Sequence, residues 1–233
     1  MATQREPKVE PRIPLSRDRV LRAAVDLADE GGLRSLTMRR LAEALGAEAM
    51  SLYYHVANKE EVLDGIVEVV AGEINEAVDQ IGLPSQGADW KKAVRQRILT
   101  AREILLRHPW APRLLETRTS ASPVVLRYLD GLVGLMRDGG FSYDLGHQAL
   151  HALGSRALGF TQELFVPDEG AAAEPDPAML EQMAEQLPHL TGMMMEVAHD
   201  NPDSTLGWCD AQTEFEFGLD LILDGLDRQR ETA

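Results

Sequence analysis

The stretch that decides the fold runs from Leu36 to Val56 and reads LTMRRLAEALGAEAMSLYYHV. Its first half repeats apolar residues at three- and four-residue spacings, namely Met38, Leu41, Ala42 and Leu45. This spacing predicts an amphipathic helix that Gly46 ends. A second apolar and aromatic segment, expected as a seven-residue helix, follows from Met50 to Val56. Two short helices joined by a glycine-containing turn are typical of a helix-turn-helix motif.

Further helices are expected on both sides of this motif. Upstream, Leu21, Ala24, Val25 and Ala28 form one apolar stripe. Ser16 is placed to cap its first turn, and Gly31-Gly32 is expected to end it. Downstream, Asn58 is expected to cap a long helical pattern that continues to Val78.

The remainder of the chain also has helical periodicity. The patterns cover residues 90–107, 124–136, 140–165 and 206–230, and no segment sustains the period-two alternation of a strand. We therefore predict an all-α protein. Residues 166–178 hold three prolines and four acidic residues, which indicates a mobile surface loop.

Charge divides the chain in the same place as the motif does. The net charge of the 233 residues is −15, which at first sight argues against a nucleic-acid partner. Residues 1–58, however, carry a net +1, whereas residues 59–233 carry −16. The first quarter is therefore expected to be a separate domain, without the acidic surface that would repel DNA.

Composition also suggests where the protein works. The single Cys209 cannot form an internal disulfide, and the polar segment 1–15, expected as a flexible arm, has no signal-peptide core. No apolar run approaches the ~20 residues that span a bilayer. These features predict a cytoplasmic protein that does not contact a membrane.

The aromatic residues after Met50 are the most informative candidates for function. Leu41, Leu45, Leu52 and Val56 are expected to pack between the two helices, which leaves Tyr53, Tyr54 and His55 at the surface. Their hydroxyl and imidazole groups suit phosphate oxygens, while Met50 and Ser51 suit base edges. A second interpretation remains open, in which the tyrosines only plug a junction between two domains.

The quoted stretch and its flanks resemble a known family. Residues 20–47 and the run Ser51-Leu-Tyr-Tyr-His-Val-Ala-Asn-Lys-Glu-Glu-Val-Leu-Asp64 are similar to the DNA-binding domain of TetR-family transcriptional regulators. Weaker motifs, among them Thr117-Arg118, Leu158-Gly159 and residues 215–226, resemble the tetracycline-repressor-like C-terminal domain of that family.

The resemblance implies a homodimeric repressor that a small-molecule inducer releases from a palindromic operator. It implies a three-helix DNA-binding domain at 16–62 and a long helix leading into a ligand-binding and dimerisation domain at 63–233. Ala49 stands where tetracycline-binding members have a base-reading glutamine, which suggests a different operator. Carried over by position, the DNA-contacting residues are Met38, Arg39, Ala49, Met50, Ser51, Tyr53, Tyr54, His55 and Lys59.

The same resemblance implies a ligand pocket. Leu114 replaces the histidine that holds drug-bound magnesium in tetracycline-binding members, so the inducer is expected to differ from magnesium–tetracycline, and no metal or other cofactor is expected. Arg97 is open to two interpretations, a polar anchor for the ligand or one half of an ion pair. The implied pocket residues are Asn75, Arg97, Ala101, Leu114, Thr117, Leu132, Ser155 and Glu163.

Other functions have less support in the sequence. His147 and His151, four residues apart, could share a metal ion, but a zinc site normally needs a third protein ligand and none is visible. No G-x-S-x-G elbow, phosphate-binding glycine loop, dinucleotide fingerprint or HExxH motif occurs, so we do not expect an enzyme. The remaining alternative is a helical small-molecule-binding or adaptor protein without sequence-specific DNA binding.

Overall fold

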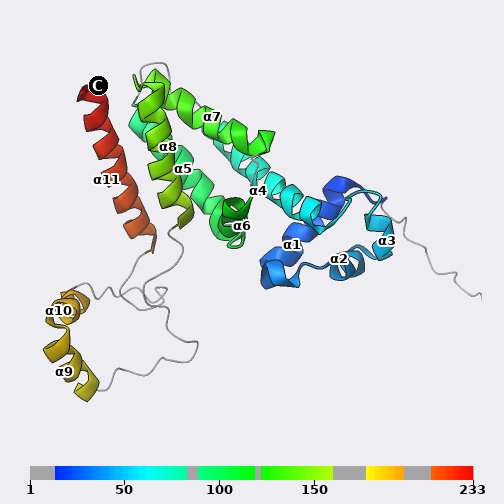
Figure 1. Cartoon of the computed structure of the whole chain (residues 1–233), viewed down its shortest axis with the longest axis horizontal. Helices are drawn as coiled ribbons and strands as arrows, with labels where there is room; N and C mark the ends of the chain where they lie inside the picture. Colours follow the sequence, from blue (N-terminus) through cyan, green and yellow to red (C-terminus); the bar gives the residue numbers. More distant parts are fainter. Residues whose placement is uncertain (1–13, 83–88, 119–121, 160–176, 197–210, 233) are drawn as a thin grey trace, which may run out of the picture. The chain divides into compact units, whose positions relative to one another are not determined.

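The computed structural model describes residues 14–82, 89–118, 122–159, 177–196 and 211–232. These residues form eleven α-helices and no strand, which confirms the all-α prediction (Figure 1). None of these helices is both long and apolar enough to cross a membrane. Glu163, residues 1–13 of the expected arm, residues 166–176 of the expected loop and residues 206–210 of the expected last helix lie outside the described residues.

The chain divides into two compact units, which are described separately. Unit 1 comprises residues 1–81 and 100–128, and unit 2 comprises residues 82–99 and 129–233. Helices α5 (Trp90–Arg107) and α7 (Pro123–Asp138) contribute to both units. The domain boundary expected near residue 62 stays a prediction.

Unit 1 begins with a three-helix head, built from α1 (Arg17–Ser35), α2 (Met38–Leu45) and α3 (Ala49–Leu52), in which α2 and α3 form the helix-turn-helix. Local capping defines its helix ends. The Ser16 Oγ accepts a hydrogen bond from the Arg19 N–H at 3.2 Å, and the Thr37 Oγ1 accepts one from the Arg40 N–H at 3.2 Å. Gly46 ends α2 in the left-handed region, at φ 62°, where glycine is favoured.

The regular part of α1 ends at Gly31-Gly32, as predicted, because both glycines have non-helical backbone angles, with φ 66° at Gly32. Beyond this kink one further turn continues to Ser35. The Ser35 hydroxyl donates to the Leu27 carbonyl at 2.7 Å across that kink, which holds the extra turn in place. The expected length of the next helix was wrong: α3 has four residues instead of seven, and beyond Leu52 the chain continues as turns.

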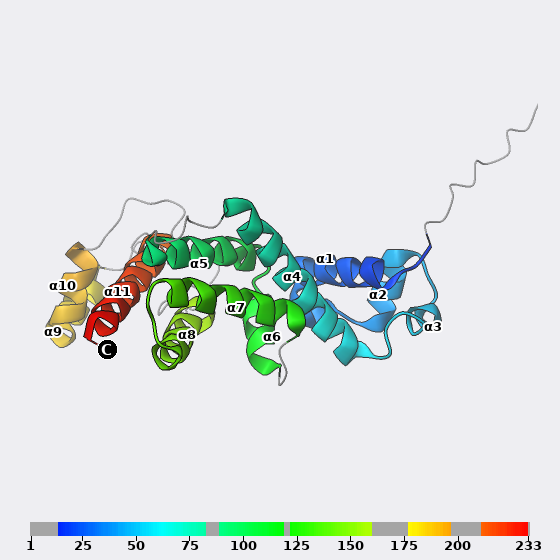
Figure 2. The same cartoon turned by 90° about the horizontal axis from the view of Figure 1, so that it is seen from above.

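The core of the helix-turn-helix is formed by the residues that the periodicity indicated. Leu41 and Leu52 are fully buried and Val56 is 1% exposed, whereas Leu45 is only half-buried. Helix α4 (Lys59–Ile81) packs against α1, and its Ile66 is fully buried. The remaining helix of unit 1, α6 (Ala111–Thr117), packs against α4. Figure 2 shows α1, α2 and α3 grouped beside the first turns of α4.

Unit 2 contains α8 (Tyr143–Gly159), α9 (Pro177–Gln186), α10 (Pro188–Glu196) and α11 (Ala211–Thr232). Leu219 and Leu223 of α11 are fully buried, and α11 packs against α8. Ion pairs join α11 to the first half of α5: the Arg95 Nε donates to Asp220 at 2.7 Å and its Nη2 to Glu216 at 2.6 Å, and Lys91 pairs with Asp224. The complementary charges stabilise this helix pair together with the apolar core.

Candidate functional site

The end of α3 presents large side chains to solvent. Met50 is 73% exposed and Tyr54 is 88% exposed, while Leu52 between them is fully buried. This burial anchors α3 to the core and so orients its neighbours outward. Tyr54 therefore does not pack inside unit 1, and Tyr53 is 43% exposed.

Backbone hydrogen bonds set the shape of this surface. The Ser51 N–H and its Oγ both donate to the Glu48 carbonyl, at 2.9 and 2.6 Å, which tightens the first turn of α3. The Val56 N–H donates to the Leu52 carbonyl at 3.0 Å and brings the chain back to the core. The segment between them, with Tyr53 and Tyr54, is therefore held as an ordered turn although it is not a helix.

The start of α4 is fixed beside this turn. The Asn58 Oδ1 accepts from the Glu61 N–H at 2.9 Å, as predicted, and Glu61 in return accepts from the Ala57 N–H at 2.6 Å. This reciprocal capping places Lys59 at the first position of the helix. Among the predicted DNA contacts, Arg39, Ala49, Met50, Tyr53, Tyr54 and Lys59 are exposed, and Met38, Ser51 and His55 are half-buried.

Arg39 already has a partner in the protein. Its Nε donates to Glu43 at 2.9 Å, one turn along α2, and this hydrogen bond raises the pKa of the guanidinium. The Arg39 side chain is 88% exposed, so water screens the pair and a phosphate can replace Glu43 at small cost.

The positions expected to bind a ligand fall in different surroundings. In unit 1, Asn75 is 4% exposed and donates through Nδ2 to the Val124 carbonyl at 2.9 Å, so it ties α4 to the start of α7. Ala101 and Leu114 are buried. Thr117 is exposed and donates to the Leu114 carbonyl at 2.8 Å.

In unit 2, the three other described positions also differ. Leu132 is buried and Ser155 is exposed. Arg97 is half-buried, and its guanidinium lies so close to Gly131 that a Cβ there would be 2.4 Å from Nη2. Arg97 is therefore packed against the backbone of α7.

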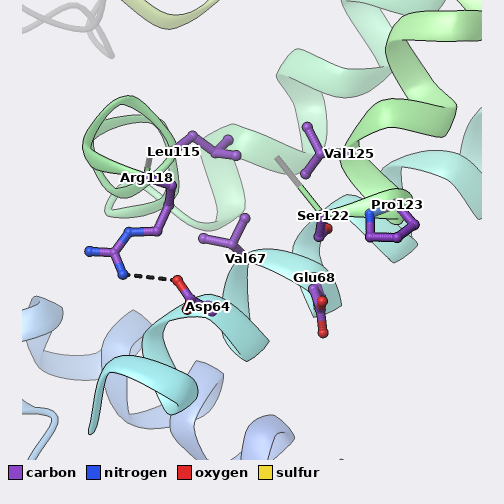
Figure 3. Close-up of a pocket in the computed structure, with 8 residues that line it drawn as sticks. All are labelled: Asp64, Val67, Glu68, Leu115, Arg118, Ser122, Pro123 and Val125. Carbon is purple, nitrogen blue, oxygen red and sulfur yellow. Dashed lines mark hydrogen bonds and ion pairs between the residues drawn. The ribbon is translucent and has the colours of Figure 1, made fainter. Parts of the chain in front are cut away.

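Sequence reasoning missed a cavity in unit 1. It has a volume of about 380 Å³ and lies between α4, the end of α6 and the start of α7 (Figure 3). None of the eight predicted ligand positions lines it. Its apolar wall is formed by Val67, Leu115, Pro123 and Val125. Its polar groups come from Asp64, Glu68, Arg118 and Ser122.

Two polar features of the cavity indicate what it can hold. The buried Ser122 Oγ has no hydrogen-bond partner among the described residues, so a ligand hydroxyl or carbonyl would satisfy it. Asp64 accepts a hydrogen bond from Arg118, and Glu68 accepts one from Arg17 at 3.3 Å. Each carboxylate is thus paired with an arginine, so the polar side of the cavity suits an uncharged ligand best.

A buried polar cluster joins three helices of unit 1. His108, just after α5, is 7% exposed, and its Nδ1 lies 2.9 Å from Asp29 of α1. The Trp110 Nε1 donates to the same carboxylate at 2.6 Å, and the His108 Nε2 lies 3.3 Å from Glu73 of α4. The partners of His108 are 35 and 79 residues away in the sequence, so no local pattern could have identified this cluster.

Comparison with known proteins agrees with this arrangement. Residues 20–66 match the family model of bacterial regulatory proteins of the tetR family, and residues 83–230 match the tetracyclin repressor-like C-terminal domain. The class D tetracycline repressor of Escherichia coli is 30% identical over 219 residues, which are 92% of this chain and 90% of that protein. An HTH-type transcriptional regulator of Saccharopolyspora erythraea is 37% identical over 127 residues, 54% of this chain and about half (51%) of that relative's length.

Solved structures show the same fold. A possible TetR family transcriptional regulator from Streptomyces coelicolor has a TM-score of 0.71 at 32% identity, covering 91% of this chain and 98% of that one. ActR from the same organism, solved with actinorhodin, has a TM-score of 0.67 at 26% identity over 94% of this chain and 99% of its own.

The fold and the exposed end of α3 define a helix-turn-helix transcriptional regulator with an α-helical C-terminal domain. The chain belongs to the TetR family of transcriptional regulators.

Proposed function

We propose that the protein is a ligand-responsive transcriptional repressor that acts in the cytoplasm and binds a palindromic operator as a homodimer. The observation that carries this proposal is the exposed end of α3, where Met50 and Tyr54 project while Leu52 anchors the helix. A nearly neutral head lowers the electrostatic cost of approaching DNA, although the rest of the chain is acidic.

Each predicted DNA contact has a role that its chemistry suits. Met50 and Ser51 face base edges, where Met50 can contact a thymine methyl. Tyr53, Tyr54 and His55 donate hydrogen bonds to phosphates. Lys59 contributes a positive charge, and the N-terminus of α4, at which it stands, also attracts phosphate. Ala49 offers only a methyl group, so the operator differs from that of a relative with a glutamine there. Met38 and Arg39 complete the contact set from α2.

The cavity of unit 1 is the proposed site at which an effector acts. Its apolar wall suits a flat apolar body, and Ser122 suits one hydroxyl or carbonyl group on it. ActR, a relative of the same fold, was solved with actinorhodin, which supports a small-molecule effector here as well. The positions Ala101, Leu114, Thr117, Arg97, Leu132, Ser155 and Glu163 stay predictions as further ligand contacts, and Asn75 is the least suited because Val124 occupies its amide.

Coupling between the cavity and the head follows from Arg118. This residue lines the cavity and donates to both Asp64 and Glu60 in the first turns of α4. An effector that displaces Arg118 would release those turns, and Lys59 is the residue next to Glu60. The operator would then lose a fitted phosphate contact.

A footprinting experiment tests the repressor function. The full chain is incubated with the DNA upstream of its own gene at low and at physiological salt. We expect a protected palindrome with half-sites about one helical turn apart, and an affinity that falls steeply with salt. A salt-independent affinity, or protection spread evenly along the DNA, would favour the adaptor alternative.

A further inference from the structure

Two histidines on the exposed face of α8 converge on one point. The Nε2 atoms of His147 and His151 lie 3.2 Å apart, and the two rings meet edge to face with centroids 4.7 Å apart. Both side chains are exposed, on the side of α8 opposite to the buried Ala149 and Leu153. The sequence showed only their spacing, whereas the structure shows that the two Nε2 atoms lie side by side.

The separation of the nitrogens suits a single transition-metal ion. Two imidazoles on one tetrahedral Zn²⁺, at Zn–N distances of ~2.0–2.1 Å, have their nitrogens ~3.4 Å apart. Without a metal ion, a hydrogen bond between the two rings holds the nitrogens at a similar distance. A metal ion that binds the lone pairs of both nitrogens would replace that hydrogen bond. Imidazole prefers Zn²⁺, Cu²⁺ and Ni²⁺ over Mg²⁺ and Ca²⁺.

One chain supplies only half of such a site. Within the described residues, no group of three or more histidine, cysteine or carboxylate side chains could hold a metal ion. Asp144, one turn before His147, is engaged by the Gln148 amide at 2.9 Å. A closed zinc site needs four ligands, so the missing two must come from elsewhere.

A second copy of the chain is the source that fits. The α8 and α11 helices lie side by side and run antiparallel, because Arg156 donates to the Glu214 carbonyl and Arg230 to the Gly139 carbonyl (Figure 1). Beside the middle of α8, α11 exposes Phe217 (66%) and Leu221 (55%), an apolar surface that a partner would cover. A two-fold interface sets the same surface of each copy against the other.

We propose that His147 and His151 of two copies bind one Zn²⁺ ion between them, so that zinc strengthens the dimer. This inference rests on the proposed homodimer but not on DNA binding. The acidic character of residues 59–233 also favours a cation there.

The test uses untagged full-length protein treated with a chelator and then titrated with ZnSO₄ in a calorimeter and in the analytical ultracentrifuge. We expect one Zn²⁺ per two chains and a dimer dissociation constant at least tenfold lower with zinc. His147→Ala and His151→Ala should each abolish that gain while their circular dichroism stays unchanged. His189→Ala, which removes an exposed histidine of α10 in the same unit, should retain it.

The outcomes separate the two proposals. One Zn²⁺ per chain, or undiminished zinc binding by His151→Ala, would overturn the shared site. A dimer that forms without zinc and does not respond to zinc would overturn the proposed metal site and leave the proposed repressor function unaffected. A chain that stays monomeric with and without zinc would overturn both the shared site and the proposed homodimer, and footprinting would then decide the DNA contact by itself.

Discussion

The Nη1 of Arg118 lies 2.9 Å from Oδ1 of Asp64, and it also donates to Glu60 at 3.1 Å. The hydrogen bond with Asp64 is the largest cause of the raised pKa of Arg118. Arg118 follows α6 directly, and its two acceptors lie in the first turns of α4. Because α4 begins at Lys59, this pair joins the end of α6 to the segment that completes the head.

Removing that tie should affect DNA binding more than folding. For Arg118→Ala we expect a loss of operator affinity of about fivefold, or about 1 kcal/mol, because the first turn of α4 is no longer held. The unfolding free energy should fall by less than about 1 kcal/mol, since both acceptors are well exposed. Fluorescence anisotropy with operator DNA and a thermal melt measure the two effects.

Arg127→Ala is the matched control for that variant. Arg127 also donates from α7 to α4, with its Nη2 2.7 Å from Asp79, but Asp79 lies near the opposite end of α4. This variant should keep its operator affinity. An equal loss of operator affinity in both variants would show that any arginine pair on α4 supports DNA binding, and that the position of Arg118 at the first turns of α4 is not special.

The tyrosine at the end of α3 should matter for DNA alone. Tyr54→Ala is expected to weaken operator binding about tenfold, because a phosphate contact is lost, and to leave the salt dependence of the affinity unchanged, because the lost hydroxyl carries no charge. Its melting temperature should not change, since the side chain is 88% exposed. Tyr143→Ala, at 71% exposure in unit 2, controls for removal of a surface tyrosine and should bind normally.

Two glycines of α4 should respond in opposite directions to alanine. A Cβ at Gly65 would lie 2.4 Å from Cδ2 of Leu21, so Gly65→Ala should destabilise unit 1 by about 1–3 kcal/mol. Gly72 has no atom within 4 Å of the added Cβ, so Gly72→Ala should stabilise α4 by about 0.5–1 kcal/mol. Chemical denaturation measures both, and a stabilising Gly65→Ala would contradict the close packing of α1 on α4.

Acid should weaken the contact between α5 and α11. Hydrogen bonds from Gln212 and then from Arg95 lower the pKa of Glu216 below its ordinary 4.5, and Lys91 lowers the pKa of Asp224 below its ordinary 3.8. A depressed carboxyl pKa adds stability that is complete above the unfolded value and is lost as the pH falls through the folded value. The melting temperature should therefore hold steady between pH 7 and pH 5 and fall below about pH 4.5.

The variant Glu216→Gln isolates that contribution. Its melting temperature should be lower than that of the wild type at pH 7, and it should change less between pH 5 and pH 3. Parallel curves for the two proteins would mean that other carboxyl groups cause the acid sensitivity.

Magnesium–tetracycline is expected not to act as the effector. Leu114 is buried and offers no metal ligand, so tetracycline with magnesium should leave the melting temperature unchanged. A drug concentration of about 1 mM is high enough for this test, because it lies far above the dissociation constant of any effective inducer. A screen of flat, uncharged or cationic aromatic compounds by the same thermal shift should yield binders. A Ser122→Ala variant should lose affinity for a binder that uses the cavity, and an undiminished shift would place the effector elsewhere.

Local sequence patterns predicted the helices and their ends where a single residue decides them. Ser16, Asn58 and Gly46 do what their types suggest, because capping and left-handed turns involve only neighbours in the chain. Gly31-Gly32 also ends the regular part of α1, as its type suggests, but the extra turn after it escaped prediction, since that turn depends on a hydrogen bond between Ser35 and Leu27. The length of α3 escaped it too, because the apolar spacing of Leu52 and Val56 is kept by a turn as well as by a helix.

The sequence by itself determined the all-α class, the helix-turn-helix and the family, because periodicity, caps and family motifs are local. Only the tertiary structure decided which distant side chains meet. In the folded chain, Asn75 donates to the Val124 carbonyl and Arg118 donates to Asp64 beside a cavity. His108 is buried between Asp29 and Glu73. These pairings depend on how helices pack, and a one-dimensional pattern states which face of a helix is apolar but not which helix that face will meet.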